Sequence, residues 1–122
     1  MVDTGDLKSP AYSVWVRVPP LAPHMRTYIF DIDGTILQVE YGIYAEAKPI
    51  QHRIDIVNRL YNTGHKIIYW TARGANSGVD WSAFTKQQLD SFGCLYHELR
   101  CDKPHYDVWV DDKAINASVY FD

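Results

Sequence analysis

Two carboxylates stand two positions apart in the segment Asp31-Ile32-Asp33-Gly34-Thr35. In an extended strand alternate side chains point to the same face, so Asp31 and Asp33 are expected to face the same way. A tight turn at Gly34 could then aim the second acid back over the first. One carboxylate can attack phosphorus and form an aspartyl phosphate, while the other protonates the leaving oxygen and later activates water. The pair therefore suits a nucleophile at Asp31 and a general acid and base at Asp33.

Further along the chain, Thr71, Lys103 and Asp111-Asp112 could complete such a site. Four carboxylates in one cleft repel, and each pair about 4 Å apart costs roughly 4 kcal/mol at an effective dielectric of about 20. A hard divalent cation relieves this repulsion, and ligation by oxygen atoms favours Mg²⁺. Lys103 would add a positive charge and Thr71 a hydroxyl, followed by loop amides that could bind phosphate. The residue types therefore predict a magnesium-dependent reaction at a phosphate ester.

Apolar runs predict the elements that must position these residues. Strands are expected over residues 27–30, 66–70 and 108–110, and they end at Asp31, Thr71 and Asp111. Helical patterns begin near Pro49 and at Asp80 and run to about residues 62 and 92. A short hairpin is expected within residues 36–47 and a short strand from residue 95. Strands that alternate with helices predict a parallel sheet, and ligands bind at the carboxyl ends of its strands.

The expected fold class is therefore α/β: a Rossmann-like three-layer sandwich with a mainly parallel sheet, forming one domain over residues 25–122. Residues 1–24 are rich in Pro, Ser, Gly and Thr, and read as a disordered arm, an edge strand or a spurious upstream extension with Met25 as the true start.

The motif residues, taken in chain order, resemble the haloacid dehalogenase (HAD) superfamily. The segment 31–35 matches its DxDGT signature, and Thr71, Lys103 and Asp111-Asp112 match its second, third and fourth motifs. The resemblance covers roughly residues 26–116 and implies an HAD-like fold, with Asp31 as nucleophile and Asp33 as acid and base.

The same resemblance implies two binding groups. Phosphate would be bound by Thr71, Ala72 and Lys103. Magnesium would be held by Asp31, the backbone carbonyl of Asp33, and Asp111, with Asp112 a ligand directly or through water.

A narrower likeness, to small capsule-biosynthesis phosphatases, is carried by the segments 44–49, 71–73, 103–104 and 110–114. The likeness gives no substrate by itself, and the leading hypothesis is a sugar phosphate of surface-polysaccharide metabolism. Only about a dozen residues separate the first strand from the first helix, too few for a cap domain. An open site would accept a large or tethered substrate, or use a second subunit or a partner as a lid. Tyr41, Tyr44 and the loop 73–79 are candidate substrate contacts, and Arg73 could bind an anion, cap a helix or form an ion pair.

The composition and net charge bear on the partners and the cellular location expected for this protein. The 122 residues carry a net charge of −3, which counts against nucleic acid as a partner, and no apolar run is long enough to span a membrane. Two cysteines without a disulfide framework suit a reducing cytoplasm. A nucleotide or polynucleotide phosphatase is the alternative enzyme, and a non-catalytic phosphate-binding module is the alternative of another class.

Overall fold

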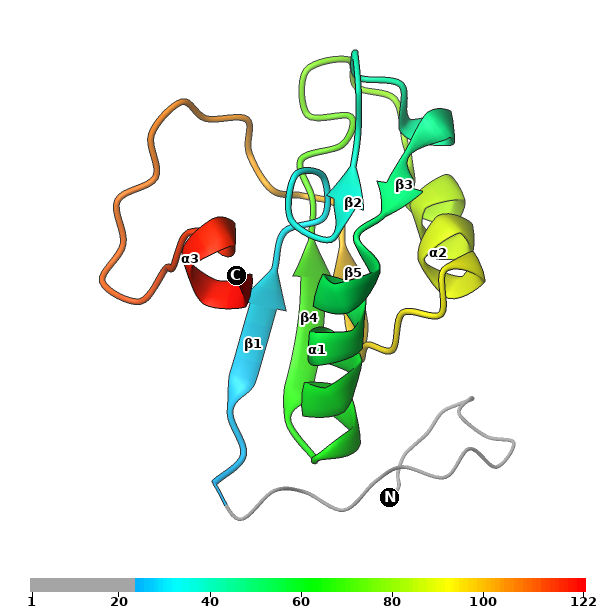
Figure 1. Cartoon of the computed structure of the whole chain (residues 1–122). Helices are drawn as coiled ribbons and strands as arrows, with labels where there is room; N and C mark the ends of the chain where they lie inside the picture. Colours follow the sequence, from blue (N-terminus) through cyan, green and yellow to red (C-terminus); the bar gives the residue numbers. More distant parts are fainter. Residues whose placement is uncertain (1–23) are drawn as a thin grey trace.

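The computed structural model describes residues 24–122, so the predictions for the N-terminal extension lie, except for His24, outside the described residues. Figure 1 shows the order of the elements along this part of the chain. The strands are β1 (Thr27–Phe30), β2 (Leu37–Gln38), β3 (Lys48–Pro49), β4 (Lys66–Trp70) and β5 (Glu98–Arg100). The helices are α1 (Gln51–Asn62), α2 (Ser82–Ser91) and α3 (Ala117–Phe121), with a 3₁₀ turn η1 (Tyr44–Glu46).

The main sheet has three parallel strands in the order β1-β4-β5. Thr27 lies opposite Lys66, and Ile68 lies opposite Glu98, so the carboxyl ends of β1, β4 and β5 meet at one edge. The α/β class, the parallel sheet and its first two strands are therefore confirmed. The third strand begins at Glu98 rather than at residue 95, after a turn that follows α2.

A two-stranded antiparallel ribbon, β2 with β3, lies between the first strand and the first helix, where a hairpin was expected. Pro49 pairs with Leu37 in this ribbon instead of opening the helix, and α1 begins at Gln51. Pro49 has no N–H to donate, which suits the end of a short ribbon as well as the first turn of a helix. No helix within residues 24–122 is long and apolar enough to cross a membrane.

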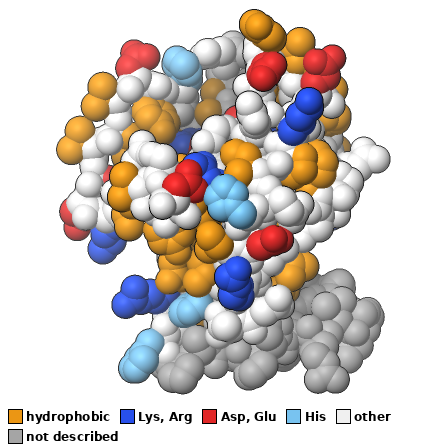
Figure 2. Space-filling model, viewed as in Figure 1, with side chains coloured by type: hydrophobic (Ala, Val, Ile, Leu, Met, Phe, Trp, Pro, Cys, Tyr) orange, Lys and Arg blue, Asp and Glu red, His pale blue; other side chains and the backbone are white. Residues whose placement is uncertain are grey.

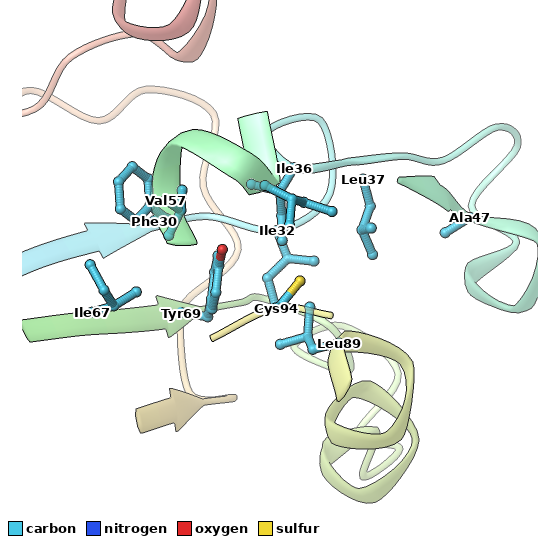
Figure 3. Packing of buried hydrophobic residues seen from close by; sticks show 11 residues of the cluster. Phe30, Ile32, Ile36, Leu37, Ala47, Val57, Ile67, Tyr69, Leu89 and Cys94 are labelled. Atoms are coloured by element: carbon cyan, nitrogen blue, oxygen red, sulfur yellow. The ribbon is translucent and has the colours of Figure 1, made fainter. Parts of the chain in front are cut away.

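The hydrophobic core lies on one face of the sheet (Figure 3). Phe30, Ile67 and Tyr69 project from β1 and β4 into a cluster that Val57 of α1 and Leu89 of α2 complete. The remaining buried members are Ile32, Ile36, Leu37, Ala47, Ile54 and Cys94. Phe121 of α3 packs against the same cluster, with its ring centroid 5.7 Å from that of Phe30.

The opposite face of the sheet is more open. Ile29 alternates with Tyr28 and Phe30 along β1, so it points to this second face, and 58% of it is exposed. Side chains of α1, α2 and α3 all contribute to the cluster on the first face. Among residues 24–122, no helix therefore covers the second face of the sheet over β1, where a three-layer sandwich would have its second helical layer. In this respect the structure departs from the expected architecture.

The strand expected over residues 108–110 is not formed. The chain from Cys101 to Asn116 contains no helix and no strand, and runs as the long excursion beside α3 in Figure 1. Val108 is 77% exposed and Val110 is 90% exposed, and Figure 2 shows hydrophobic side chains along this excursion. Trp109 instead packs on Trp70, with ring centroids 5.8 Å apart. A run of this composition becomes a strand only where a neighbouring strand pairs with it, and no described strand pairs with residues 108–110.

Candidate active site

The two acids of the first motif flank a buried turn that begins directly after β1. Ile32 is fully buried, and its carbonyl accepts hydrogen bonds from the backbone N–H groups of Thr35, Ile36 and Leu37 at 2.9–3.1 Å. Gly34 takes a φ of +84°, a conformation that costs other residues energy and that glycine adopts freely. This turn holds Asp31 and Asp33 on the wall of one cavity.

Asp31 is contacted by a hydroxyl and by a positive charge. Thr35 Oγ1 donates to Oδ2 of Asp31 at 3.2 Å, and Nζ of Lys103 lies 3.2 Å from Oδ1. The Lys103 side chain is 12% exposed and the Asp31 side chain 36%, so the pair is partly screened by water. An oriented carboxylate beside a cation is the arrangement that a nucleophile for a phosphate ester requires, because the cation attracts the anionic substrate.

Thr71 holds the loops at the carboxyl ends of β4 and β5 together. Its N–H donates to the carbonyl of Arg100 at 2.9 Å, and its own carbonyl accepts from the N–H of Lys103 at 3.2 Å. The Thr71 hydroxyl accepts from the N–H of Arg73 at 3.1 Å, and the residue is only 2% exposed. Thr71 and Ala72 both line the cavity of Asp31. The sheet therefore brings the first, second and third motifs to one edge, as the sequence predicts.

Arg73 forms an ion pair, which is one of the three roles considered for it. Its Nε and Nη2 donate to Oδ2 and Oδ1 of Asp33 at 2.8 and 2.7 Å, a bidentate pairing. The Arg73 side chain is fully buried, whereas that of Asp33 is 26% exposed. The Arg73 guanidinium therefore pairs with Asp33 and is not free to bind a ligand in the cavity.

The cavity has a volume of about 450 Å³. Of the predicted residues, Asp31, Asp33, Thr71, Ala72 and Arg73 line it. The other lining residues are Tyr44, Gly74, Asn76, Ser77, Trp81 and His105. A smaller cavity of about 240 Å³ shares Arg73, Gly74 and Trp81 with it, and the lining of the smaller cavity also includes Asp80, Asp102 and Lys103.

Asp111 and Asp112 do not line either cavity. Asp111 is exposed on the excursion, where its Oδ1 accepts from the N–H of Lys113 at 3.0 Å. This hydrogen bond, and then the contact with Asp112, lower the pKa of the Asp111 carboxyl. Since no strand forms over residues 108–110, nothing carries these two acids to the sheet edge where Asp31 lies.

The expected magnesium ligands are consequently not assembled. Within residues 24–122 no three His, Cys, Asp or Glu side chains come close enough together to hold a metal ion. Oδ1 of Asp31 faces Lys103, and both oxygens of Asp33 face Arg73. The expected ligand set does not fit this arrangement, because Asp111 and Asp112 do not line the cavity of Asp31.

Some residues at the site were not singled out from the sequence. Trp81 lines both cavities and packs edge-on against Tyr44, with ring centroids 5.0 Å apart. Thr85 and Gln88 lie on the buried face of α2, where they contact Arg73. Their signal in the sequence was two polar residues on an otherwise apolar helix face. Tyr41, a candidate contact, is 93% exposed and does not line the cavity.

The chain matches no family model, and no curated protein matches it. Among solved structures it is similar to the crystal structure of a structural-genomics target from Vibrio cholerae, with a TM-score of 0.71 and 24% sequence identity. The match covers 79% of this chain and 87% of that chain. At this identity the likeness shows the fold alone. The protein is an α/β protein with a parallel sheet, and a cavity lined by Asp31 and Asp33 opens at the carboxyl ends of its strands.

Proposed function

We propose that this protein is a phosphomonoester hydrolase of the HAD type that works through an aspartyl phosphate on Asp31. The observation that carries the proposal is the setting of the Asp31 carboxylate. It lies at the carboxyl end of β1, between the hydroxyl of Thr35 and the ammonium of Lys103, and it shares a cavity with Asp33. A mere binding site for phosphate has no need of two carboxylates, because they repel the ligand.

The reaction has two halves. An oxygen of Asp31 attacks phosphorus, the P–O bond to the leaving group breaks, and Asp33 gives its proton to the departing oxygen. Water then attacks the phosphorus of the acyl phosphate, Asp33 takes a proton from that water, and inorganic phosphate leaves with Asp31 restored. Lys103 offsets the negative charge that the phosphoryl group brings to Asp31.

Magnesium enters the proposal only as the cofactor that the sequence resemblance implies. Asp31 and Asp33 are the cavity residues that could contribute to such a site. The requirement is tested by adding a chelator to the assay and then restoring Mg²⁺ or Ca²⁺. Activity that persists unchanged in the chelator contradicts a metal requirement and leaves the covalent step intact.

A sugar phosphate is the proposed substrate class. Tyr44 and Trp81 give the cavity an aromatic wall, and Asn76, Ser77 and His105 give it polar groups. Aromatic rings pack on the apolar faces of sugars, while amide, hydroxyl and imidazole groups bind their hydroxyls. The net charge of −3 counts against a polynucleotide.

The central experiment compares the wild-type chain with Asp31→Asn on 4-nitrophenyl phosphate. Asp55→Asn is a matched control, because Asp55 is an exposed carboxylate on α1 that bonds only Gln51 among the described residues. We expect phosphate release by the wild type and by the control, and a loss of about a thousandfold or more in Asp31→Asn. Acid-quenched wild-type enzyme should carry a phosphoryl group on Asp31, detectable by mass spectrometry. Equal turnover by Asp31→Asn would contradict the covalent mechanism, and binding of phosphate without turnover would favour a phosphate-binding module.

A further inference from the structure

Arg73 is a buried cation next to a candidate proton-transfer group, and it makes an unusual number of contacts. Its side chain is fully buried. The guanidinium has five N–H donors, and four hydrogen bonds engage them: two to Asp33, one to Thr85 at 3.2 Å and one to Gln88 at 2.8 Å. Its charged carbon also lies 4.4 Å from the centre of the Tyr44 ring.

Thr85 and Gln88, which accept hydrogen bonds from Arg73, are themselves fixed in place by burial and by a further hydrogen bond. Thr85 and Gln88 project from α2 and are 0% and 8% exposed. Gln88 also donates from Nε2 to the carbonyl of Tyr44 at 2.8 Å, which ties α2 to the turn η1. Side chains of two elements outside the sheet, α2 and η1, therefore contact the guanidinium. A planar group held at this many points cannot turn independently of the surrounding structure.

Asp33 differs from Arg73 in its exposure. Its side chain is 26% exposed and lines the cavity, while its two oxygens meet the buried guanidinium. Because the pairing is bidentate, the plane of the carboxylate follows the plane of Arg73. The direction in which Asp33 faces the cavity is therefore set by α2 and η1, acting through Arg73.

We propose that Arg73 is a positioning residue that fixes the orientation of Asp33 for proton transfer, and that Thr85 and Gln88 serve it as anchors. This inference rests on the proposed function, in which Asp33 protonates the leaving oxygen and deprotonates water. Both Asp33 oxygens are acceptors in the observed pairing, which is the form that receives the proton of water. In the next turnover Asp33 gives that proton to the leaving oxygen, while Arg73 keeps the group at the cavity wall. Arg73 itself does not touch the substrate.

The test uses two esters that differ in their need for a proton. 4-Nitrophenolate departs without protonation, whereas the more basic phenolate of phenyl phosphate benefits from an acid. The ratio of kcat/KM for 4-nitrophenyl phosphate to that for phenyl phosphate therefore reports how well Asp33 transfers its proton. A change that only loosens the fold should lower both values together.

Arg73→Lys keeps the charge and removes the bidentate fork. We expect this ratio to rise about tenfold in Arg73→Lys, and to rise likewise in Asp33→Asn. The double variant should show no further rise, because both changes remove the same proton transfer. Arg100→Lys is the matched control: Arg100 also pairs with an aspartate, Asp102, but its side chain is 51% exposed, so its ratio should match the wild type.

An unchanged ratio in a folded Arg73→Lys would overturn the inference, as would independent effects that multiply in the double variant. If Arg73→Lys does not fold, Gln88→Met and Thr85→Val keep Arg73 and remove one anchor each, and we expect the same rise to a smaller extent. An unchanged ratio in both anchor variants also overturns the inference. Absence of turnover of both esters by the wild type is a different result, because it overturns the proposed function itself.

Discussion

Nζ of Lys103 lies 3.2 Å from Oδ1 of Asp31, although 72 positions separate the two residues in the sequence. The contact depends on the loop after β5, since the N–H of Lys103 donates to the carbonyl of Thr71 at the end of β4. The parallel order β1-β4-β5 places β4 between the other two strands, so the loop must cross it to reach β1. The path of this loop therefore decides whether the Lys103 ammonium lies beside the Asp31 carboxylate.

Replacing Lys103 by Met should therefore lower kcat/KM for an aryl phosphate by about a hundredfold, because a positive charge next to the phosphoryl group is lost. Lys103→Arg should retain part of the activity, since it keeps the charge. Lys86→Met is a suitable control, because Lys86 pairs with Asp90 on the exposed side of α2. The measurement is steady-state kinetics, and wild-type kinetics in Lys103→Met would contradict the role of this cation.

Gly74 should tolerate alanine far less well than Gly78, although both take a positive φ, +85° and +75°. A Cβ on Gly74 would meet the carbonyl oxygen of Val79 at 2.1 Å, whereas one on Gly78 meets nothing within 4 Å. We expect Gly78→Ala to lower the free energy of unfolding by about 1 kcal/mol from backbone strain alone. Gly74→Ala should cost about 3 kcal/mol, because the backbone of the cavity wall must also move. Urea unfolding of both variants is the measurement. An equal loss of unfolding free energy in the two variants would show that the backbone of the cavity wall moves at little cost.

The stability of the protein should decrease as the pH falls through about 6.5, and His97 should account for part of the decrease. Burial, and then the charge of Lys66, lower the pKa of His97 below that of an ordinary histidine. The unfolded chain therefore binds a proton at a higher pH than the folded protein does, so stability is lost as the pH falls through the pKa of the unfolded state. The ring also uses Nδ1 to accept from the N–H of Ile67 at 3.0 Å, which requires an unprotonated nitrogen.

The measurement is the free energy of unfolding between about pH 7.5 and pH 5.5, in the wild type and in His97→Asn. Asparagine keeps an acceptor near the position of Nδ1 and does not titrate. We expect a shallower pH dependence in His97→Asn. The same slope in His97→Asn and the wild type would assign the effect to other groups.

The two thiols should react at different rates in the folded protein. Cys94 is 6% exposed, and burial raises the pKa of its thiol to about 12. Cys101 is partly exposed beside the smaller cavity, and burial followed by the charge of Asp80 raises its pKa more modestly. A disulfide reagent should label Cys101 first and reach Cys94 only when the protein unfolds, because the thiolate is the reactive form. Labelling of the single variants Cys94→Ala and Cys101→Ala by mass spectrometry checks this order, which fast labelling of Cys94 in the native protein would contradict.

The sequence by itself determined the elements whose patterns are local. The apolar runs that end at Asp31 and Thr71 form β1 and β4, because a short run of β-branched and aromatic residues predicts a strand without reference to the rest of the chain. The helical spacing that predicts α1 and α2 is local in the same way. Parallel pairing then brings Asp31 and Thr71 to one edge, which the alternation of strands and helices implies.

Tertiary structure alone decided which partner each polar group takes. Val108-Trp109-Val110 has the composition of a strand, yet Trp109 packs on Trp70 and the segment does not pair with β1, so Asp111 lies away from the cavity. From its sequence position, Arg73 could bind an anion, cap a helix or pair with an acid. It pairs with Asp33, which lies 40 positions away in the sequence. The physical reason is the same in both cases. The free energy of a polar or β-branched side chain depends on neighbours from distant parts of the chain. The local spacing of residues in the sequence does not show which neighbours these are.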